Sequence, residues 1–375
     1  MSFGLKSLSS YTSSNAYGML SKSMDAVMPT SLATVVNRFG STTVVYNNQY
    51  YAFIDSLNVR RSELSQIVEN NLSQNPDYIS SRQAGVKLAW QYEKADIEMG
   101  GNGSANWTTD EKKQILYSKT GTVSGTEGHH QKNVVNHPEQ QANPDNIKFY
   151  KSKQEHLQEG HNGNFQNESD APLIDKNQML KNTNNRRVLL NEIKGVSVSA
   201  AIGFGVALTI SAVVELASMG IEGVEVGDLV THSLRIGIEG GTISSITYCT
   251  GRLISNYLQD HGVDLLTKVG SLVNFAVAGA VSIVLVSIIQ FIKMKTNGVE
   301  STVAFKEVGK SALFSASILA ASIIAQGVYG GYAGLIVSTS VGVIMLTTSV
   351  VKVNRQRKQD NRIREYVIEE YKPLS

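Results

Sequence analysis

The second half of the chain contains three long stretches without a charged residue or a proline. They are residues 195–214, 269–292 and 311–351, which are 20, 24 and 41 residues long. An α-helix rises about 1.5 Å per residue and the hydrocarbon core of a bilayer is about 30 Å thick, so each of the first two stretches can cross a membrane once. The third has room for two crossings joined by a turn near residues 327–334. We therefore expect an all-α hydrophobic domain at residues 188–351 with about four membrane spans, followed by a basic tail at 352–375.

The segments between these stretches alternate in charge. Residues 215–268 carry three Lys and Arg against seven Asp and Glu, whereas residues 293–310 carry four Lys against two Glu. Basic side chains also precede the first stretch and open the tail. Because cytoplasmic loops of membrane proteins are enriched in Lys and Arg, this alternation predicts that both polar ends of the chain lie on the cytoplasmic side.

The composition of the hydrophobic stretches leaves a second interpretation open. They are rich in Gly, Ala, Ser and Thr, and pairs such as Gly327 and Gly331 suit close helix packing in a membrane or in a buried soluble bundle. Residues 229–254 are too charged for a lone span, so we expect an amphipathic helix or helix pair there. The alternative to lipid contact along residues 195–351 is therefore a soluble helical domain that forms homo-oligomers in the cytoplasm.

The first 194 residues are polar and carry five of the six prolines. The chain's 34 Lys and Arg nearly balance its 32 Asp and Glu, so the net charge of +2 argues neither for nor against a nucleic-acid partner. Cys249 is the single cysteine, which excludes an intramolecular disulfide and a Cys-based zinc knuckle. A metal would therefore have to bind His, Asp, Glu or Asn. A chain of 375 residues has room for two or three domains.

We expect residues 1–80 to form a mixed region of hairpin and helix. Residues 1–30 read as a loosely ordered arm or a short helix. In residues 42–54, β-branched and aromatic side chains flank an Asn pair that can adopt positive φ, which predicts a β-hairpin. Apolar residues at helical spacing then predict a helix over residues 57–72.

Two further helices are predicted before the histidines begin. Residues 81–99 show helical spacing of apolar side chains and end at a Gly pair. Thr108 and Glu111 have the spacing of a capping box, which predicts a short helix over residues 109–118.

Histidines collect in one segment of the chain. Five of the seven are His129, His130, His137, His156 and His161. The pair His129–His130 follows a segment that reads as an entering strand. Asn143 as N-cap with Pro144 at the first helical position predicts a helix that carries Ile147, Phe149 and His156 and ends at Gly160.

This arrangement suits phosphodiester hydrolysis, which requires a base to activate water and a metal to stabilise charge on the phosphate. Imidazole can serve in both roles. Adjacent residues on a strand point to opposite faces, so His129 and His130 should differ, one binding metal and the other facing the water. A His-rich loop that binds zinc without catalysis is the alternative.

The ordered motifs carry a family resemblance. They are Gly128-His129-His130, Asn143-Pro144-Asp145-Asn146, Glu155-His156-Leu157 and His161-Asn162-Gly163-Asn164. Over roughly residues 81–180 the chain resembles the HNH/endonuclease VII superfamily of ββα-metal nucleases, and in particular the GHH-signature branch found in bacterial polymorphic toxins. The resemblance implies an α+β ββα-metal nuclease domain, which we place at residues 81–187.

The resemblance also implies roles for individual residues. His130 would be the general base, His129 a metal ligand, and Asn146 the middle Asn of the catalytic motif, which braces the ββ loop against the helix. His156 would be a metal or phosphate ligand and His161 is the competing candidate, because the spacing does not separate them. The expected cofactor is one divalent ion, Mg²⁺ or else Zn²⁺ or Mn²⁺. His137 has no counterpart in the motif and reads as a loop residue.

Together these features predict a metal-dependent endonuclease that hydrolyses nucleic acid, DNA in preference to RNA, as a bacterial toxin or antiphage effector. We expect it in the bacterial inner membrane with its nuclease domain in the cytoplasm, and an immunity protein as a further partner. Residues 110–194 hold 12 Lys and Arg against 11 Asp and Glu, so local patches such as Lys148 and Lys151 would have to supply phosphate contacts. The alternative is a pore-forming or membrane-translocation protein with an accessory nuclease-like domain.

Overall fold

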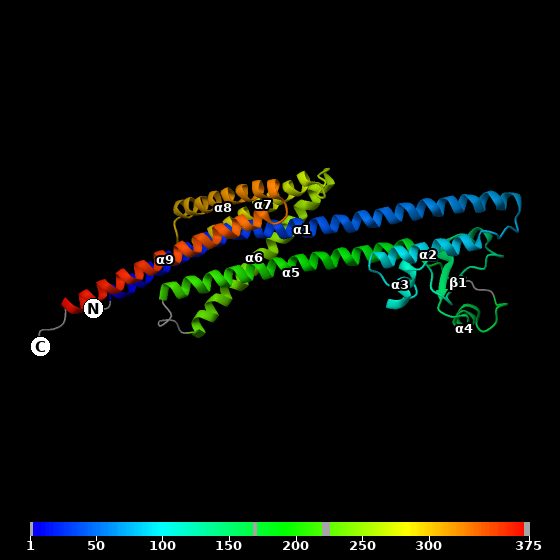
Figure 1. Cartoon of the computed structure of the whole chain (residues 1–375), viewed down its shortest axis with the longest axis horizontal. Coiled ribbons are helices and arrows are strands. Elements are labelled where there is room, and N and C mark those ends of the chain that lie inside the picture. The colour runs from blue at the N-terminus through cyan, green and yellow to red at the C-terminus, as the bar shows by residue number, and fades with distance from the viewer. Residues whose placement is uncertain (1–2, 168–170, 220–225, 371–375) are drawn as a thin grey trace. The chain divides into compact units, whose positions relative to one another are not determined.

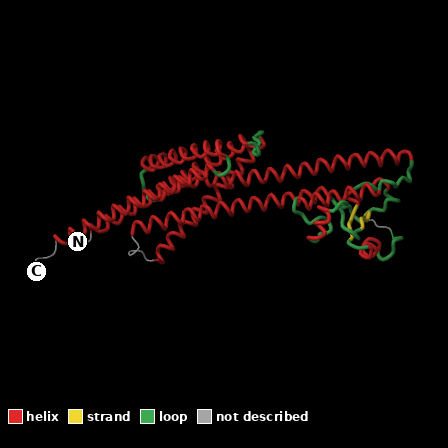
Figure 2. The backbone as a smooth tube through the Cα atoms, in the orientation of Figure 1, coloured by secondary structure: helices red, strands yellow, loops and turns green. Residues whose placement is uncertain are grey.

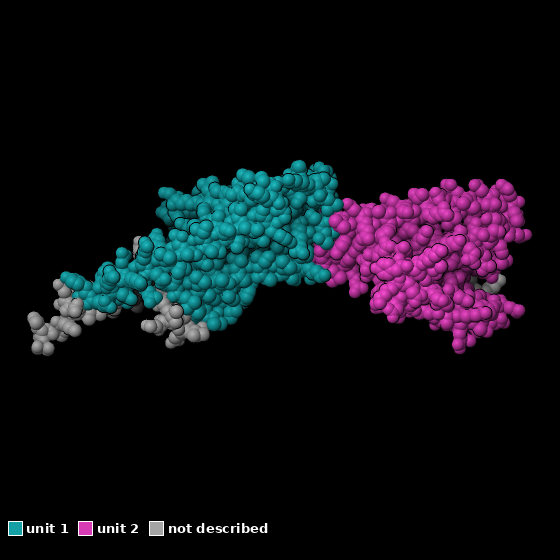
Figure 3. Space-filling model, viewed as in Figure 1, with its two compact units in different colours: residues 1–42, 192–375 teal, residues 43–191 magenta. Residues whose placement is uncertain are grey.

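The computed structural model describes residues 3–167, 171–219 and 226–370, so the end of the predicted tail, 371–375, lies outside the described residues. The chain divides into two compact units, drawn in different colours in Figure 3. One unit is Thr43–Asn191, and the other combines Met1–Thr42 with Glu192–Ser375. Helices predominate in both units, and the described part of the chain contains one two-stranded sheet (Figure 2).

Helix α1 runs without interruption over Phe3–Gln74 (Figure 1). The β-hairpin predicted over residues 42–54 is therefore wrong, and the arm or short helix expected over 1–30 is part of this long helix from Phe3 onward. Its side chains pack with α2 (Arg82–Glu98) and the start of α5 (Lys176–Met219). The side chains that α1 contributes recur at helical spacing and are Tyr50, Phe53, Ile54, Leu57, Leu64 and Val68. This helical packing outweighs the local β-propensity of residues 42–54.

Helices α2 and α3 (Thr109–Tyr117) confirm two predictions from the sequence. The capping box of α3 is present. The backbone N–H of Glu111 donates to the Thr108 hydroxyl at 3.4 Å, and the backbone N–H of Thr108 donates to Glu111 Oε2 at 2.7 Å. These two bonds fix where α3 begins.

The paired histidines lie on the first of two strands. Strand β1 (Glu127–His130) pairs antiparallel with β2 (Ile147–Tyr150), with His130 opposite Ile147. The helix predicted from Asn143 is therefore wrong, because Pro144–Asn146 form only a 3₁₀ turn before β2. Asn143 does cap this turn, accepting a hydrogen bond from Asp145 N at 3.1 Å. Ile147 and Phe149 are buried on one face at the two-residue period of a strand. This burial favours the strand over the predicted helix.

The helical segment that bears His156 begins later than predicted. Helix α4 covers only Lys153–Glu155, with the Ser152 hydroxyl accepting from Glu155 N, and continues as a π-helical turn over His156–Gly160. Single π-helical turns occur frequently at functional sites. The termination near Gly160 is as predicted.

An aromatic core lies behind the hairpin. The Phe149 ring of β2 lies 4.1 Å from the Trp90 ring of α2, and Trp90 stacks on Trp107 at 5.4 Å between centroids. Gly128 is enclosed by the same core, since a Cβ there would lie 3.0 Å from Val86 Cγ1 and 3.3 Å from Ile147 Cγ2. The strand can approach α2 this closely because residue 128 has no side chain.

The described residues include four long apolar helices, the first of which begins in the unit Thr43–Asn191. The segments long and apolar enough to cross a membrane are Lys176–Ala217 in α5, Lys268–Thr296 (α7), Ser301–Tyr329 (α8) and Ala333–Tyr366 in α9 (Ala333–Glu370). At most 28% of the most apolar part of each helix is buried inside the protein, so most of this apolar surface faces outward. Gly330 and Gly331 adopt positive φ in the turn between α8 and α9, where the sequence predicted it.

Helix α6 (Val226–Asp260) is the charged segment between the first two apolar stretches, and it forms one continuous helix. It crosses α5 at small residues. A Cβ on Gly203 of α5 would lie 2.0 Å from the Ser244 hydroxyl and 2.3 Å from the Gly240 carbonyl oxygen of α6. Small residues permit this close backbone approach, a packing mode frequent among membrane helices.

Candidate active site

Three of the predicted histidines converge. His129 extends from β1, His156 opens the π-helical turn and His161 follows it directly. One ligand atom of each lies within 4.8 Å of the others, and His129 Nδ1 is 2.9 Å from His156 Nε2. The structure thus brings His156 and His161 together with His129, although the sequence spacing had made them competing candidates.

The outward nitrogen of two of these rings is held by a hydrogen-bond acceptor. His156 Nδ1 lies 2.6 Å from Glu127 Oε2, and His161 Nδ1 lies 2.9 Å from the carbonyl oxygen of Asn167. Because a carboxylate and a carbonyl oxygen only accept, each Nδ1 carries the proton and each Nε2 offers its lone pair to the cluster. Fixing the ring by its second nitrogen is characteristic of metal-binding histidines.

The donor set fits a metal ion. His129 is 6% exposed, and its Nε2 is buried with no hydrogen-bond partner among the described residues. Burial, followed by the neighbouring charges of His156 and His161, lowers the pKa of His129 to about 3. The ring is therefore neutral at physiological pH, as a metal ligand must be. His129, His156 and His161 could together hold one ion and leave a coordination position open for substrate.

His130 lies apart from this cluster, on the other side of β1, as strand alternation predicts. Its Nε2 is 3.1 Å from the carbonyl oxygen of Gln141 and so carries the proton, which makes Nδ1 the basic nitrogen. Burial lowers the pKa of His130 to about 4, although the bond to Gln141 acts in the opposite direction. His130 is therefore a neutral imidazole at pH 7.

Asn146 is fully buried and ties the loop after β1 to the turn before β2. Its Oδ1 accepts from Lys132 N at 2.6 Å, and its Nδ2 donates to the carbonyl oxygens of Lys132 and Gln140, each at 3.2 Å. The side chain thus braces the loop between the strands, which is the kind of role that the resemblance implied. The partners are loop residues rather than the helix that bears His156.

His137 lies in a surface loop, where its Nδ1 is 3.5 Å from Glu139 Oε1 and its side chain is 43% exposed. It takes no part in the cluster, as expected for a loop residue.

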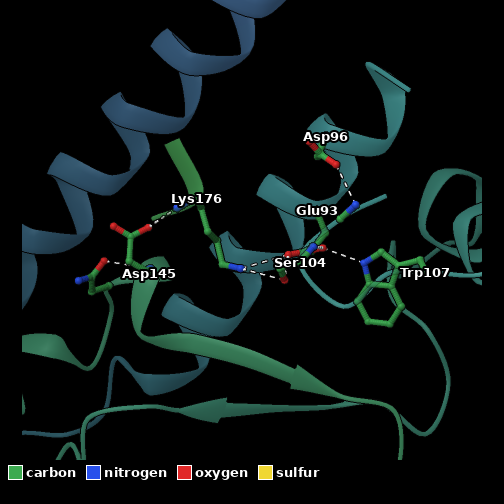
Figure 4. A network of polar contacts seen from close by, with 8 residues as sticks. Glu93, Asp96, Ser104, Trp107, Asp145 and Lys176 are labelled. Carbon is green, nitrogen blue, oxygen red and sulfur yellow. Dashed lines mark hydrogen bonds and ion pairs between the residues drawn. The ribbon is translucent and has the colours of Figure 1, made fainter. Parts of the chain in front are cut away.

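A buried polar network surrounds Glu93 of α2 (Figure 4). Lys176 Nζ lies 3.1 Å from Glu93 Oε1, and both side chains are completely buried. Glu93 also accepts from Ser104 N, the Ser104 hydroxyl and Trp107 Nε1 at 2.5–2.7 Å. At the same helix start, Lys176 N donates to Asp145 Oδ1 at 3.1 Å. The network therefore connects α2, α5 and the turn that carries Asn146.

The sequence did not indicate the buried polar network or the role of Glu127. Glu127 could have been recognised, because it stands two residues before His129 on the predicted strand and so shares its face. Glu93 and Lys176 are 83 positions apart, and neither stands in a motif, so no local signal connected them.

Substitution of Glu127 by Gln should weaken Zn²⁺ binding about 10- to 100-fold, the usual cost of losing a partner that orients a ligating histidine. Isothermal titration of the full-length protein measures this, and Glu139→Gln is the matched control because Glu139 is exposed and lies beside His137 in a surface loop. Equal affinities for the wild type and Glu127→Gln would show that the carboxylate does not orient His156.

The comparison with known proteins identifies the segment that contains the hairpin. Residues 79–151 match the Tox-GHH family, described as a GHH signature containing HNH/Endo VII superfamily nuclease toxin. The match includes His129, His130 and Asn146, and His156 and His161 follow its end. No curated protein and no solved structure matches the chain. Residues 79–151 are thus a Tox-GHH domain, which belongs to the HNH/Endo VII superfamily of nuclease toxins and implies nuclease activity on nucleic acid.

Proposed function

We propose that this protein is a metal-dependent endonuclease that cleaves DNA at the cytoplasmic face of a bacterial inner membrane, as a toxin or antiphage effector. The observation that carries the proposal is the convergence of His129, His156 and His161 beside the GHH motif, with two of the rings anchored through Nδ1. A surface cluster of histidines without a function would not need this anchoring.

Each residue of the site has a role in the proposed reaction. His129, His156 and His161 would hold a divalent ion, which when bound stabilises negative charge on the phosphate and on the leaving oxygen. By the family resemblance His130 would be the general base, and Nδ1 is its nitrogen able to accept a proton from water, because the Gln141 carbonyl holds Nε2–H and fixes the ring. Asn146 keeps the loop after His130 in place through its three hydrogen bonds.

The chemistry of the three ligand atoms indicates which metal the site would prefer. Three imidazole nitrogens suit Zn²⁺ and other transition metals, whereas Mg²⁺ prefers oxygen ligands and retains its waters. We therefore favour Zn²⁺ over Mg²⁺ for this site.

The proposed function predicts metal-dependent cleavage of supercoiled plasmid by the full-length protein in detergent. Chelation should abolish cleavage, and Zn²⁺ should restore it at lower concentration than Mg²⁺, because imidazole binds Zn²⁺ more tightly. A parallel reaction with single-stranded RNA tests the preference for DNA. Cleavage that persists in the chelator would contradict the metal-dependent mechanism, and cleavage of RNA alone would contradict the proposed substrate.

The outward-facing apolar surface of α5, α7, α8 and α9 supports the proposed membrane location. After alkaline carbonate extraction, the full-length protein should remain with the membrane pellet, because four helices of this length bury enough apolar surface in the bilayer to resist release. The pellet is compared by immunoblot with a peripheral and an integral marker protein. Release together with the peripheral marker would favour the soluble helical bundle.

A further inference from the structure

A cavity of about 780 Å³ lies within the helical unit, between α1, α6, α7 and α8. Its volume is in the range of sites that bind small molecules. The nuclease domain contributes nothing to it, because every lining residue belongs to the unit formed by Met1–Thr42 and Glu192–Ser375. Its walls combine apolar side chains such as Met28, Ile243 and Val286 with the charged side chains of Arg235 and Lys293.

One end of the cavity carries most of its charged side chains and the other is mainly apolar, with Asp25 between them, bonded to Gln290 at 2.8 Å. Helices α6 and α7 are antiparallel, because Glu239 contacts Lys293 whereas Ser255, further along α6, bonds Asn274, further back along α7. From this ion pair, Ile243 lies four residues, about 6 Å, along α6, and Val286 lies seven residues, about 10 Å, back along α7. Both displacements lead away from the turn between α7 and α8. The cavity is therefore amphipathic along its length.

The acidic side chains Glu239 and Glu307 at the charged end each have a lysine partner, and Lys22 lines the cavity there as a further cation. Lys293 pairs with Glu239, and Glu307 pairs with Lys310 at 2.6 Å. Arg235 makes no hydrogen bond or ion pair with any residue that the structure describes. Its guanidinium lines the cavity with five N–H donors in a geometry that matches a phosphate.

The outer face of α6 places the cavity beside lipid. Val230, Leu234 and Ile238 are 41–64% exposed and recur every four residues, so they form one apolar stripe. Arg235, Glu239 and Ile243 line the cavity from the other side of the helix.

We propose that this cavity binds one anionic phospholipid, with its phosphate on Arg235 and an acyl chain along Ile243 and Val286. The alternation of charged and apolar ends matches the two parts of such a lipid, and the stripe on α6 gives it access from the bilayer. The site is separate from the histidine cluster and does not depend on the proposed nuclease activity.

Native mass spectrometry of the full-length protein, released from detergent after incubation with phosphatidylglycerol, tests the proposal. The wild type should retain one lipid, and Arg235→Gln and the cavity-filling Ile243→Trp should each lower its occupancy at least tenfold. Arg355→Gln is the matched control, because Arg355 is an exposed arginine of α9 that does not line the cavity. Circular dichroism confirms that each variant keeps its helices.

Two results would overturn the proposal. Equal lipid occupancy in the wild type, Arg235→Gln and Ile243→Trp would show that the retained lipid lies elsewhere. Displacement of the lipid by glycerol phosphate or inorganic phosphate at equal concentration would show that the site binds the phosphate alone, without using the apolar wall.

Discussion

Replacing His130 with alanine should lower plasmid cleavage by about 100- to 10,000-fold, the usual contribution of a general base, and leave Zn²⁺ affinity unchanged. Cleavage should fall because the resemblance assigns the general base to His130. Zn²⁺ affinity should not change because β1 directs His129 into the histidine cluster and His130 to the opposite side, against the carbonyl of Gln141. Cleavage is measured as the initial rate of plasmid nicking by the full-length protein, and affinity by isothermal titration.

Two companion variants make this result specific. His156→Ala should lose both cleavage and Zn²⁺ binding, because His156 is a member of the cluster. His137→Ala should change neither, since His137 lies in a surface loop beside Glu139. If His130→Ala still cleaves within threefold of the wild-type rate, another group accepts the proton. If it loses Zn²⁺ as well, His130 acts in metal binding or in folding.

Substitution of Glu93 by Gln should lower the stability of the nuclease unit by about 3–5 kcal/mol, the typical cost of leaving one member of a buried ion pair uncompensated. The substituted side chain keeps an amide oxygen that can accept from Lys176 but carries no charge, so the ammonium would be left with neutral partners, among them the Ser104 hydroxyl at 3.4 Å and the face of the Phe149 ring. Lys176→Met should cost less, because Glu93 retains its three hydrogen bonds from Ser104 and Trp107. The double variant should recover most of the loss.

The measurement is thermal unfolding followed by tryptophan fluorescence. The chain has two tryptophans, Trp90 and Trp107, and both lie in the aromatic core beside Glu93, so the signal reports on this unit alone. Lys113→Met is the control, because its ion pair with Asp110 is exposed and should contribute less than about 1 kcal/mol. A loss below about 1 kcal/mol in Glu93→Gln would contradict the importance of the buried pair.

The sequence predicted features that depend on local periodicity. The apolar stretches, the capping box at Thr108 and Glu111, and the opposite orientation of His129 and His130 each follow from spacing within a few residues. The same reasoning failed where one local pattern suits two structures. Asn143 with Pro144 is a helix start in isolation, but burial of Ile147 and Phe149 in the hairpin converts the following residues into a strand.

Long-range packing explains the other differences. Residues 42–54 have strand-like composition, yet Tyr50 and Phe53 pack with residues of α2 as part of one helix. The histidine cluster depends on a π-helical turn that places His156 and His161 near His129, and helical spacing alone does not predict such a turn.

The family-matched segment, residues 79–151, does not bury all of its own apolar surface. Its helix α2 buries Leu88, Tyr92 and Ala95 against α1 and against Leu180 of α5, and both of these partners lie outside residues 79–151. Glu93 is likewise neutralised by a lysine from outside the match. Excision of residues 79–151 would expose this apolar face and leave the carboxylate of Glu93 without its lysine partner. Transplanting the toxin segment into another protein would therefore require the flanking helices to accompany it.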